Sequence, residues 1–252
     1  MGYEVADGLA YLVMCGWDDI PHLTEAAKRD LLAGLPPHQR NARSRGIPQL
    51  GSGAVYPIDE DMIVVPDRKI GDDWPRCYGL DVGWNVTCAE FLAQDPLSKV
   101  WYVYSEHYMG KEEPVIHAAA IKARGAFIPG VIDPASRGRS QHDGRQLIQQ
   151  YRELGLDVEP ADNSVEAGVF LVWQLFSGGM LKIFESVSNL RAELRFYRRN
   201  ENGKIIKERD HGADSLRYAC MSGRERARVA PVKKDLFSAK FKYGNTQGSW
   251  MN

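Results

Sequence analysis

The chain has 252 residues, of which 44% are hydrophobic and 26% charged, and its formal net charge is −1. This composition excludes a wholly disordered chain, and the near-neutral charge excludes a uniformly basic nucleic-acid binder. No apolar run approaches the roughly 18 residues of a membrane span, and the four cysteines form no CxxC pair, which argues against a zinc site and favours a reducing compartment.

Residues 1–73 are rich in turn-forming residues and predict a connector rather than a self-sufficient core. No basic stretch precedes the first apolar residues, so we expect no secretory signal. Residues 24–32 predict a short helix, with the Thr24 hydroxyl as its N-cap. The rest, including residues 63–66, predicts strand pieces and loops.

Residues 74–223 predict an α/β fold. Three β-rich runs at 77–83, 86–93 and 100–108 predict a three-strand meander, with a turn at Asp95 and Pro96. The following elements are predicted to alternate: helix 114–124, strand 127–133 with a bulge at 129–130, helix 143–154, strand 157–159, helix 165–176, strand 181–184, helix 187–197, a turn at 200–203 and helix 212–221. This order predicts a mixed central sheet, a meander plus parallel strands, with helices on both faces. Residues 224–252 predict a basic, flexible tail.

Three aspartates stand at positions that make them candidate metal ligands. Asp81 lies inside an apolar strand, where a carboxylate needs a cation or strong donors. Asp133 ends a second apolar strand, and sites in α/β sheets collect at strand ends. Asp214 lies in the first turn of the last predicted helix. If the fold brings the three together, they cannot all stay charged and unpaired, and a hard divalent cation, Mg²⁺ or Mn²⁺, is the simplest resolution.

Each of these residues also has a structural explanation. Asp81 fits a turn or edge position, Asp133 fits a strand end before a proline, and Asp214 fits a residue that satisfies the helix dipole. Asp210 is expected as the N-cap of the last helix, and it is a further candidate ligand. His211 is expected as a packed or capping residue, or as a residue that supports the ligands from behind.

Other catalytic motifs are missing from the sequence. There is no GxxxxGK[ST] phosphate loop, so no P-loop ATPase site is expected. There is no GxSxG, HExxH or Cys–His signature. Ser105, Glu106 and His107 alternate across a predicted strand, which leaves Glu106 as a further acidic candidate.

Basic residues flank the aspartates on both sides. Residues 191–209 hold seven Lys or Arg against three Glu, and the loop after Asp133 carries two arginines beside a glycine. This pattern fits a surface that grips phosphates, and it also fits an ordinary solvated surface. The candidate DNA-binding residues are Arg137, Arg139, Arg198, Arg199, Lys204 and Lys207.

Residues 78–83, 131–135 and 210–218 together resemble the C-terminal nuclease domain of tailed-bacteriophage terminase large subunits, the DNA-packaging motor. The last stretch resembles the family pattern DHxxDAxRY, with Ser215 in place of the usual alanine. Residues 17–23 and 46–53 resemble the region that joins the motor's ATPase to its nuclease. The resemblance covers roughly residues 10–223, and the sequence departs from the family in lacking the ATPase half.

The resemblance implies an RNase H-like fold and a metal-dependent endonuclease that cuts double-stranded viral DNA concatemers during genome packaging by two-metal-ion hydrolysis. It implies Asp81, Asp133 and Asp214 as catalytic ligands of two Mg²⁺ or Mn²⁺ ions. Residues 1–73 would then be the remnant of the joining region, 74–223 the nuclease domain and 224–252 the tail. The implied partners are double-stranded DNA, the motor ATPase domain, the portal and the small terminase subunit, in the cytoplasm of the infected bacterial host and without a membrane.

Two alternatives stay open on the sequence. In the first, the chain is a non-catalytic DNA-binding or docking module of a packaging complex, in which the aspartates are structural and the basic residues 224–242 dock on a partner or on DNA. Divalent-independent binding without cleavage would identify it. In the second, the chain is another RNase H-like nuclease of the resolvase or transposase type, which would prefer branched DNA or RNA–DNA hybrids.

Overall fold

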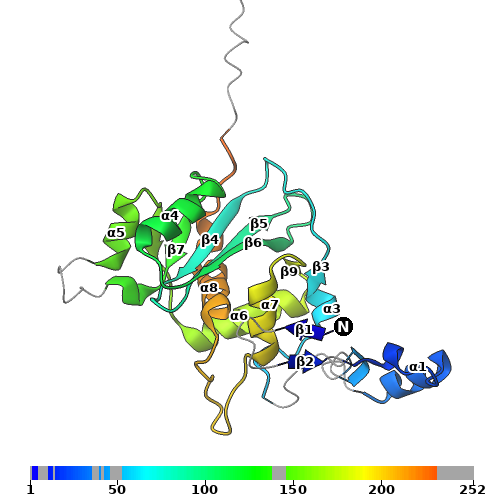
Figure 1. Ribbon diagram of the computed structural model, residues 1–252. Coiled ribbons are helices and arrows are strands. Elements are labelled where there is room, and N and C mark those ends of the chain that lie inside the picture. The colour runs from blue at the N-terminus through cyan, green and yellow to red at the C-terminus, as the bar shows by residue number, and fades with distance from the viewer. Residues whose placement is uncertain are drawn as a thin grey trace, which may run out of the picture.

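A mixed β-sheet organises the chain. The computed structural model describes residues 2–4, 11–13, 15–35, 40, 43–45, 53–137 and 146–231 (Figure 1). Within this part, one sheet has seven strands in the order β3-β9-β6-β5-β4-β7-β8. The pairs β4–β5 and β5–β6 are antiparallel, and the other four pairs are parallel. The strands are β3 (Val64–Val65), β4 (Arg76–Asp81), β5 (Thr87–Gln94), β6 (Trp101–Met109), β7 (Gly130–Ile132), β8 (Val158–Pro160) and β9 (Leu181–Phe184). The predicted meander with added parallel strands is confirmed.

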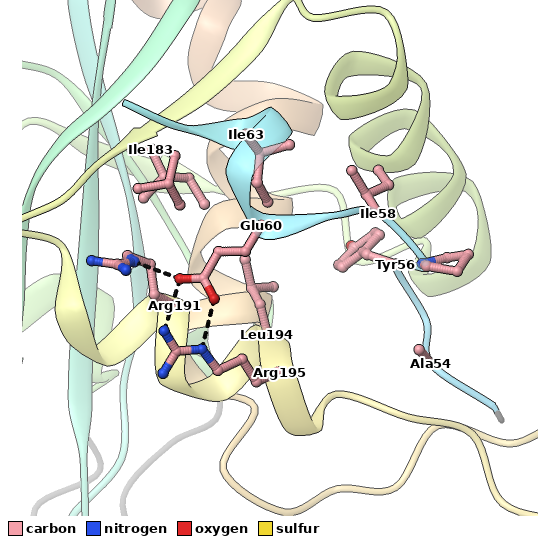
Figure 2. A pocket seen from close by; sticks show the side chains of 11 residues that line it. Ala54, Tyr56, Ile58, Glu60, Ile63, Ile183, Arg191, Leu194 and Arg195 are labelled. Carbon is pink, nitrogen blue, oxygen red and sulfur yellow. Dashed lines mark hydrogen bonds and ion pairs between the residues drawn. The ribbon is translucent and has the colours of Figure 1, made fainter. Parts of the chain in front are cut away.

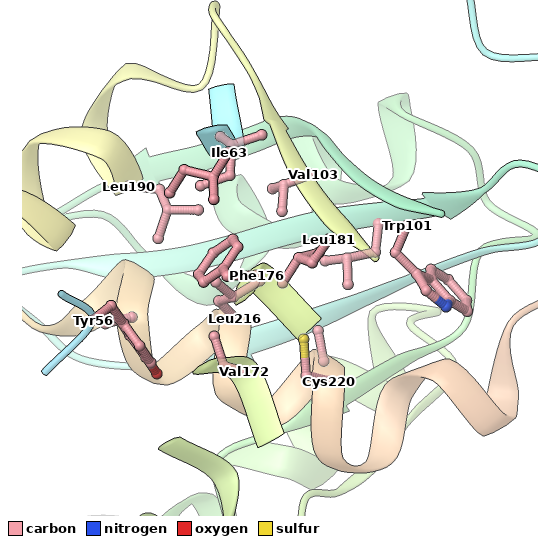
Figure 3. Packing of buried hydrophobic residues seen from close by; sticks show 14 of the residues in the cluster. Tyr56, Ile63, Trp101, Val103, Val172, Phe176, Leu181, Leu190, Leu216 and Cys220 are labelled. Carbon is pink, nitrogen blue, oxygen red and sulfur yellow. The ribbon is translucent and has the colours of Figure 1, made fainter. Parts of the chain in front are cut away.

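Helices cover both faces of this sheet, as predicted. The helices α4 (Pro114–Ala123) and α5 (Leu147–Glu153) cover one face, and α6 (Val165–Ser177), α7 (Ser188–Phe196) and α8 (His211–Tyr218) cover the other. Neighbouring side chains of β4 alternate between the two layers. Tyr78 packs with residues of α4 and α5, whereas Cys77 packs in the cluster under α6 and α8. Figure 3 shows the second layer, where Val172 and Phe176 meet Leu216.

Residues upstream of the sheet form three local elements. They are a two-stranded sheet of β1 (Gly2–Glu4) and β2 (Tyr11–Val13), the short helix η1 (Trp17–Asp19) and the helix α1 (Glu25–Ala33). The Thr24 hydroxyl accepts a hydrogen bond from the amide of Ala27 at 3.3 Å, so the predicted helix and its cap are confirmed. No helix among the described residues is both long enough and apolar enough to cross a membrane.

Residues 53–65, which we call the connector strap, pack directly on the domain. They contain the short helix α3 (Glu60–Ile63) and the edge strand β3, which pairs with β9. Glu60 accepts hydrogen bonds from Arg191 and Arg195 of α7, each at 2.8 Å (Figure 2). Tyr56 and Ile63 of the strap are buried in the core. The strap therefore contributes buried residues to the core of the domain and, as the sequence predicts, forms no separate core.

The structure differs from the predicted elements in three places. The predicted bulge at 129–130 is wrong, because Gly130 begins β7 and lets the Tyr78 ring lie against its backbone; a Cβ there would be 2.2 Å from that ring. The helix predicted over 143–154 is α5 from Leu147, and residues 143–145 lie outside the described residues. Residues 224–226 of the predicted flexible tail form the short helix α9 (Arg224–Arg226), and Arg228 forms a bridge with Arg76, so this start of the tail is held by the domain, whereas residues 232–252 lie outside the described residues.

Candidate active site

The carboxyl ends of β4 and β7 place two aspartates side by side. Asp81 is the last residue of β4, and Asp133 directly follows β7. The two strands are parallel neighbours, with Leu80 opposite Ile132, so both aspartates lie at the same edge of the sheet. The amide of Asp133 donates to the carbonyl of Leu80 at 2.9 Å, which continues the pairing up to the aspartates.

The helix α8 crosses β4 closely and brings Asp214 to the same edge. The Ser215 hydroxyl donates to the carbonyl of Gly79 at 2.9 Å and accepts from the amide of Glu90 at 3.0 Å. Serine at this position therefore joins α8 to both β4 and β5 through one buried hydroxyl. An alanine, usual in the family pattern, could make neither bond.

The three aspartates lie near enough to influence one another. Burial raises the pKa of Asp81, and the charges of Asp214 and Asp133 raise it further, against a hydrogen bond from His211. The Tyr218 hydroxyl lies 3.4 Å from Asp133 Oδ1. The structure thus places the three residues that the sequence singles out within range of one another's charges.

Cationic side chains of the same chain neutralise this acidic cluster. Lys207 Nζ lies 2.8 Å from Asp214 Oδ2 and 3.0 Å from Asp210 Oδ2. Arg217, which is fully buried, approaches Asp214 Oδ1 at 2.9 Å. The carboxylates therefore satisfy the rule that buried charges are paired, with internal cations as the partners.

His211 forms a direct hydrogen bond with Asp81. Its Nδ1 lies 2.9 Å from Asp81 Oδ2, and this hydrogen bond raises the pKa of the imidazole. The sequence predicted a supporting role for His211, and this contact shows that its Nδ1 is the atom that bonds Asp81. A protonated imidazole here fixes one oxygen of Asp81 and leaves the other without that constraint.

Asp210 stands at the N-cap position of α8, but its side chain does not cap the helix, so that part of the prediction is wrong. The cap comes from α7 instead. Glu193 Oε2 accepts hydrogen bonds from the amides of Gly212 at 2.6 Å and Ala213 at 3.2 Å, and Glu193 Oε1 accepts from the Tyr108 hydroxyl at 2.8 Å. Glu193 thereby fixes the first turn of the helix that carries Asp214.

We expect Glu193→Gln to change how stability depends on pH. Burial raises the pKa of Glu193 to about 7, against hydrogen bonds from Tyr108 and Gly212. In the unfolded chain a glutamate titrates near pH 4.3, so the folded state holds this proton more tightly. The associated stability is fully present below about pH 4 and is lost as the pH rises through about 7.

The measurement is the free energy of unfolding in urea at pH 5 and at pH 8. The wild type should lose roughly 2–4 kcal/mol more than Glu193→Gln between these values. Glu201→Gln, at an exposed position in the turn at 200–203, is the matched control and should follow the wild type. Identical pH profiles for wild type and Glu193→Gln would show that Glu193 holds no proton in this range.

Glu106, a further acidic candidate on the sequence, serves as another helix cap. Its Oε1 accepts from the amide and side chain of Asn189, both at 2.9 Å, and its Oε2 accepts from the amide of Leu190 at 3.1 Å. These bonds satisfy the first turn of α7. Glu106 is therefore placed at the start of α7 rather than in the acidic cluster.

The basic residues predicted to bind DNA have different surroundings. Arg199 forms a bidentate pair with Glu166 at 2.6 and 2.8 Å, and Lys207 points into the acidic cluster. Arg198 and Lys204 are exposed on the hairpin around the turn at 200–203. Arg137 ends the short helix η2 (Pro134–Arg137), and Arg139 lies outside the described residues.

The donor chemistry of the cluster suits a hard divalent cation. Its ligands would be carboxylate oxygens, which favour Mg²⁺ or Mn²⁺ over Zn²⁺. Asp210 Oδ2 is buried and accepts no hydrogen bond, so the ion contact with Lys207 is what balances it. Within the described ranges, no three His, Cys, Asp or Glu side chains are arranged closely enough to hold one metal ion. A metal ion at Asp214 would thus take the place of the Lys207 ammonium.

Several contacts of this site could not be assigned from the sequence. Glu193 lies 19 residues before the amide that it caps, on a different helix. Asn163 follows β8, and its Oδ1 lies 3.2 Å from Arg217 and 3.4 Å from the Tyr218 hydroxyl. The only available signal was indirect: the motif around Asp214 includes Arg217 and Tyr218, whose polar groups need partners once buried.

Comparison with known proteins gives three consistent matches. A family model described as a terminase RNaseH-like domain matches residues 79–222. The terminase large subunit of Salmonella phage P22 is 30% identical over 224 residues, which are 86% of this chain and 45% of that protein. The terminase large subunit of Enterobacteria phage LP7 is 31% identical over 211 residues, which are 81% of this chain and 44% of that protein. The chain spans less than half the length of these relatives.

The fold is also similar to a solved structure. The nuclease domain of the P22 large terminase superposes with a TM-score of 0.65 at 28% identity. The match covers 71% of this chain and 96% of that domain. The mixed sheet with helices on both faces is therefore an RNase H-like sheet of the kind that terminase nuclease domains have.

Proposed function

Because this chain belongs to the terminase RNase H-like domain family, we propose that it is a divalent-metal-dependent endonuclease that cuts double-stranded DNA. The observation that carries the proposal is that Asp81 and Asp133 end neighbouring parallel strands and that the charges of Asp133 and Asp214 act on Asp81. The ion pairs of Lys207 and Arg217 with Asp214 also support it, because they indicate that negative charge is concentrated at this site.

Asp81, Asp133 and Asp214 would hold two Mg²⁺ or Mn²⁺ ions. When bound, such a pair lowers the pKa of an attacking water and stabilises the leaving oxygen of the phosphodiester. Side chains of this chain would position the carboxylates and the substrate. His211 orients Asp81 through its Nδ1, Arg217 orients Asp214, and the Tyr218 hydroxyl faces Asp133. Lys207, once released from Asp214, can bind a DNA phosphate beside the site.

The wider role follows from the relatives, and it is part of the proposal. Two relatives that match most of this chain are terminase large subunits of phages. We infer that the chain is the nuclease part of such a subunit and cuts concatemeric viral DNA during genome packaging. It would work with a motor ATPase domain, the portal and the small terminase subunit in the cytoplasm of the infected host.

Plasmid cleavage tests the proposal. We expect nicked and linear products with Mn²⁺ or Mg²⁺ and intact supercoiled plasmid with EDTA. DNA binding should weaken steeply as salt rises, because phosphate contacts release counterions. A folded protein that binds DNA equally well with and without metal, and that cuts DNA with neither Mg²⁺ nor Mn²⁺, would instead be the non-catalytic docking module. Preferential cutting of branched DNA would indicate a nuclease of the resolvase type.

A further inference from the structure

Trp84 is a large exposed side chain close to the acidic cluster. Its side chain is 65% exposed, and it lies in the loop between β4 and β5, three residues after Asp81. Single exposed apolar residues are common on protein surfaces, so exposure alone assigns nothing. Two further observations distinguish Trp84: its backbone is held in place, and its ring borders a cavity.

The loop that carries Trp84 is braced by the turn after β6. The amide of Lys111 donates to the carbonyl of Trp84 at 2.7 Å, and Lys111 has a positive φ of 58°. Gly110 lies so close to the loop that a Cβ there would be 1.7 Å from the carbonyl oxygen of Asn85. A side chain presented from a fixed backbone loses little conformational entropy on binding. The structure thus fixes the backbone from which the indole projects.

The cavity beside Trp84 has mainly apolar walls. Its volume is about 280 Å³, close to the lower end of the range for small-molecule sites. Its apolar walls can cover the faces of a ring, and its polar groups can meet an edge. Glu112 and Glu113 are among the lining residues, and a carboxylate beside the cavity would disfavour a phosphate but could accept a hydrogen bond from an amino group. The lining includes Trp84, Thr87, Pro114, His117, Leu147 and Gln150.

This cavity and the acidic cluster flank the same edge of the sheet. Val82 lines the cavity, and it follows Asp81, whose carboxylate contacts His211 of α8. Consecutive side chains at a strand end point to opposite faces, so the cavity lies on the side of α4 and α5 and the cluster on the side of α8. A DNA strand with a phosphate at Asp81 can therefore place an adjacent base over the edge.

We propose that Trp84 stacks on an unpaired nucleobase of the bound DNA next to the phosphate that is cut, and that the adjoining cavity receives this base. The proposal rests on the proposed nuclease function and adds a determinant of where it cuts. Aromatic rings stack on bases with little sequence preference, and unpaired or mismatched bases leave the duplex most easily. Cutting should accordingly be favoured beside weakly paired positions.

The first measurement is DNA binding in EDTA, where no cleavage occurs. Trp84→Ala should bind a single-stranded thymidine oligonucleotide about tenfold more weakly than the wild type, and Trp84→Phe should retain most of the affinity. Leu97→Ala is the control, because Leu97 is 92% exposed in the turn between β5 and β6 and is not among the residues lining the cavity. Thermal melts should be alike for all four proteins. Equal affinity of Trp84→Ala and wild type would overturn the proposal.

The second measurement is cleavage with Mn²⁺ of two duplexes that differ by one central mismatch. The wild type should cut the mismatched duplex faster, and Trp84→Ala should lose this preference and show kcat/KM about tenfold lower. If the wild type cuts both duplexes and Trp84→Ala matches it on both, the stacking role is wrong and the nuclease stands. If no protein cuts any DNA, the nuclease proposal fails, and the binding measurement in EDTA decides the role of Trp84 alone.

Discussion

Asp81→Asn should abolish metal-dependent cleavage of plasmid DNA, by about a thousandfold or more, while the domain stays folded. Asparagine keeps the shape of the side chain but removes the anionic oxygens that a divalent cation requires. The variant should not be destabilised much, because burial already raises the pKa of Asp81 and so disfavours its charge. His211 loses a charged partner but keeps a polar atom to contact. The melting temperature should stay within a few degrees of the wild type.

The experiment compares wild type, Asp81→Asn and Asp72→Asn in Mn²⁺ and in Mg²⁺. Asp72 is a suitable control, because its side chain is fully exposed and its contact with Arg76 is long, at 3.9 Å. Asp72→Asn should cut like the wild type. Wild-type cutting by Asp81→Asn would remove Asp81 from the ligand set, and loss of cutting together with a collapsed melt would show a structural role instead.

Gly79→Ala should have the largest effect on stability, a loss of more than about 3 kcal/mol. A Cβ at this position would lie 2.0 Å from the carbonyl oxygen of Ser215 and 2.8 Å from the amide of Ala219. Both are backbone atoms, so no side chain can turn away. The helix cannot retreat without breaking the hydrogen bonds of the Ser215 hydroxyl to β4 and β5. Asp214 would move with it.

Urea unfolding of wild type, Gly79→Ala and Gly34→Ala measures this effect. Gly34 ends α1 with an ordinary helical φ of −80°, and the nearest atom to a Cβ there is 3.7 Å away. Gly34→Ala should therefore leave stability unchanged or raise it slightly. Equal unfolding midpoints for Gly79→Ala and wild type would mean that α8 packs less closely on β4 than described.

The parts of the fold that the sequence predicts are those held by local patterns. The meander follows from three β-rich runs joined by short connections. The runs predict Asp81 within one apolar strand and Asp133 at the end of another, but they do not predict the parallel pairing of β4 and β7 that places the two side by side. The position of Asp214 required the resemblance as well, since nothing in its own helix shows that α8 docks on Gly79. That docking depends on a missing side chain, which is visible in the sequence only as one glycine among 24.

The parts that could not be predicted depend on partners from distant segments. The capping of α8 by Glu193 replaces the local cap that Asp210 suggests, because a buried carboxylate from α7 reaches the same amides. Lys207 resembles a surface cation in sequence, yet its ammonium lies between two buried carboxylates. The two-residue strand β3 lies in a stretch that the sequence predicts as strand pieces and loops, but it is too short for a periodic signal that would show its pairing with β9.

The attachment of the connector strap has a mechanical consequence. The carbonyl of Gly53 and the amide of Val55 bond to the chain at 197–199, β3 pairs with β9, and Glu60 is held by two arginines. A force applied to the chain at residue 53 is therefore shared among these attachments. The helix α7 bears that load through Arg191 and Arg195 and supports α8 through Glu193. The helix α7 thus connects the connector strap to the helix that carries Asp214.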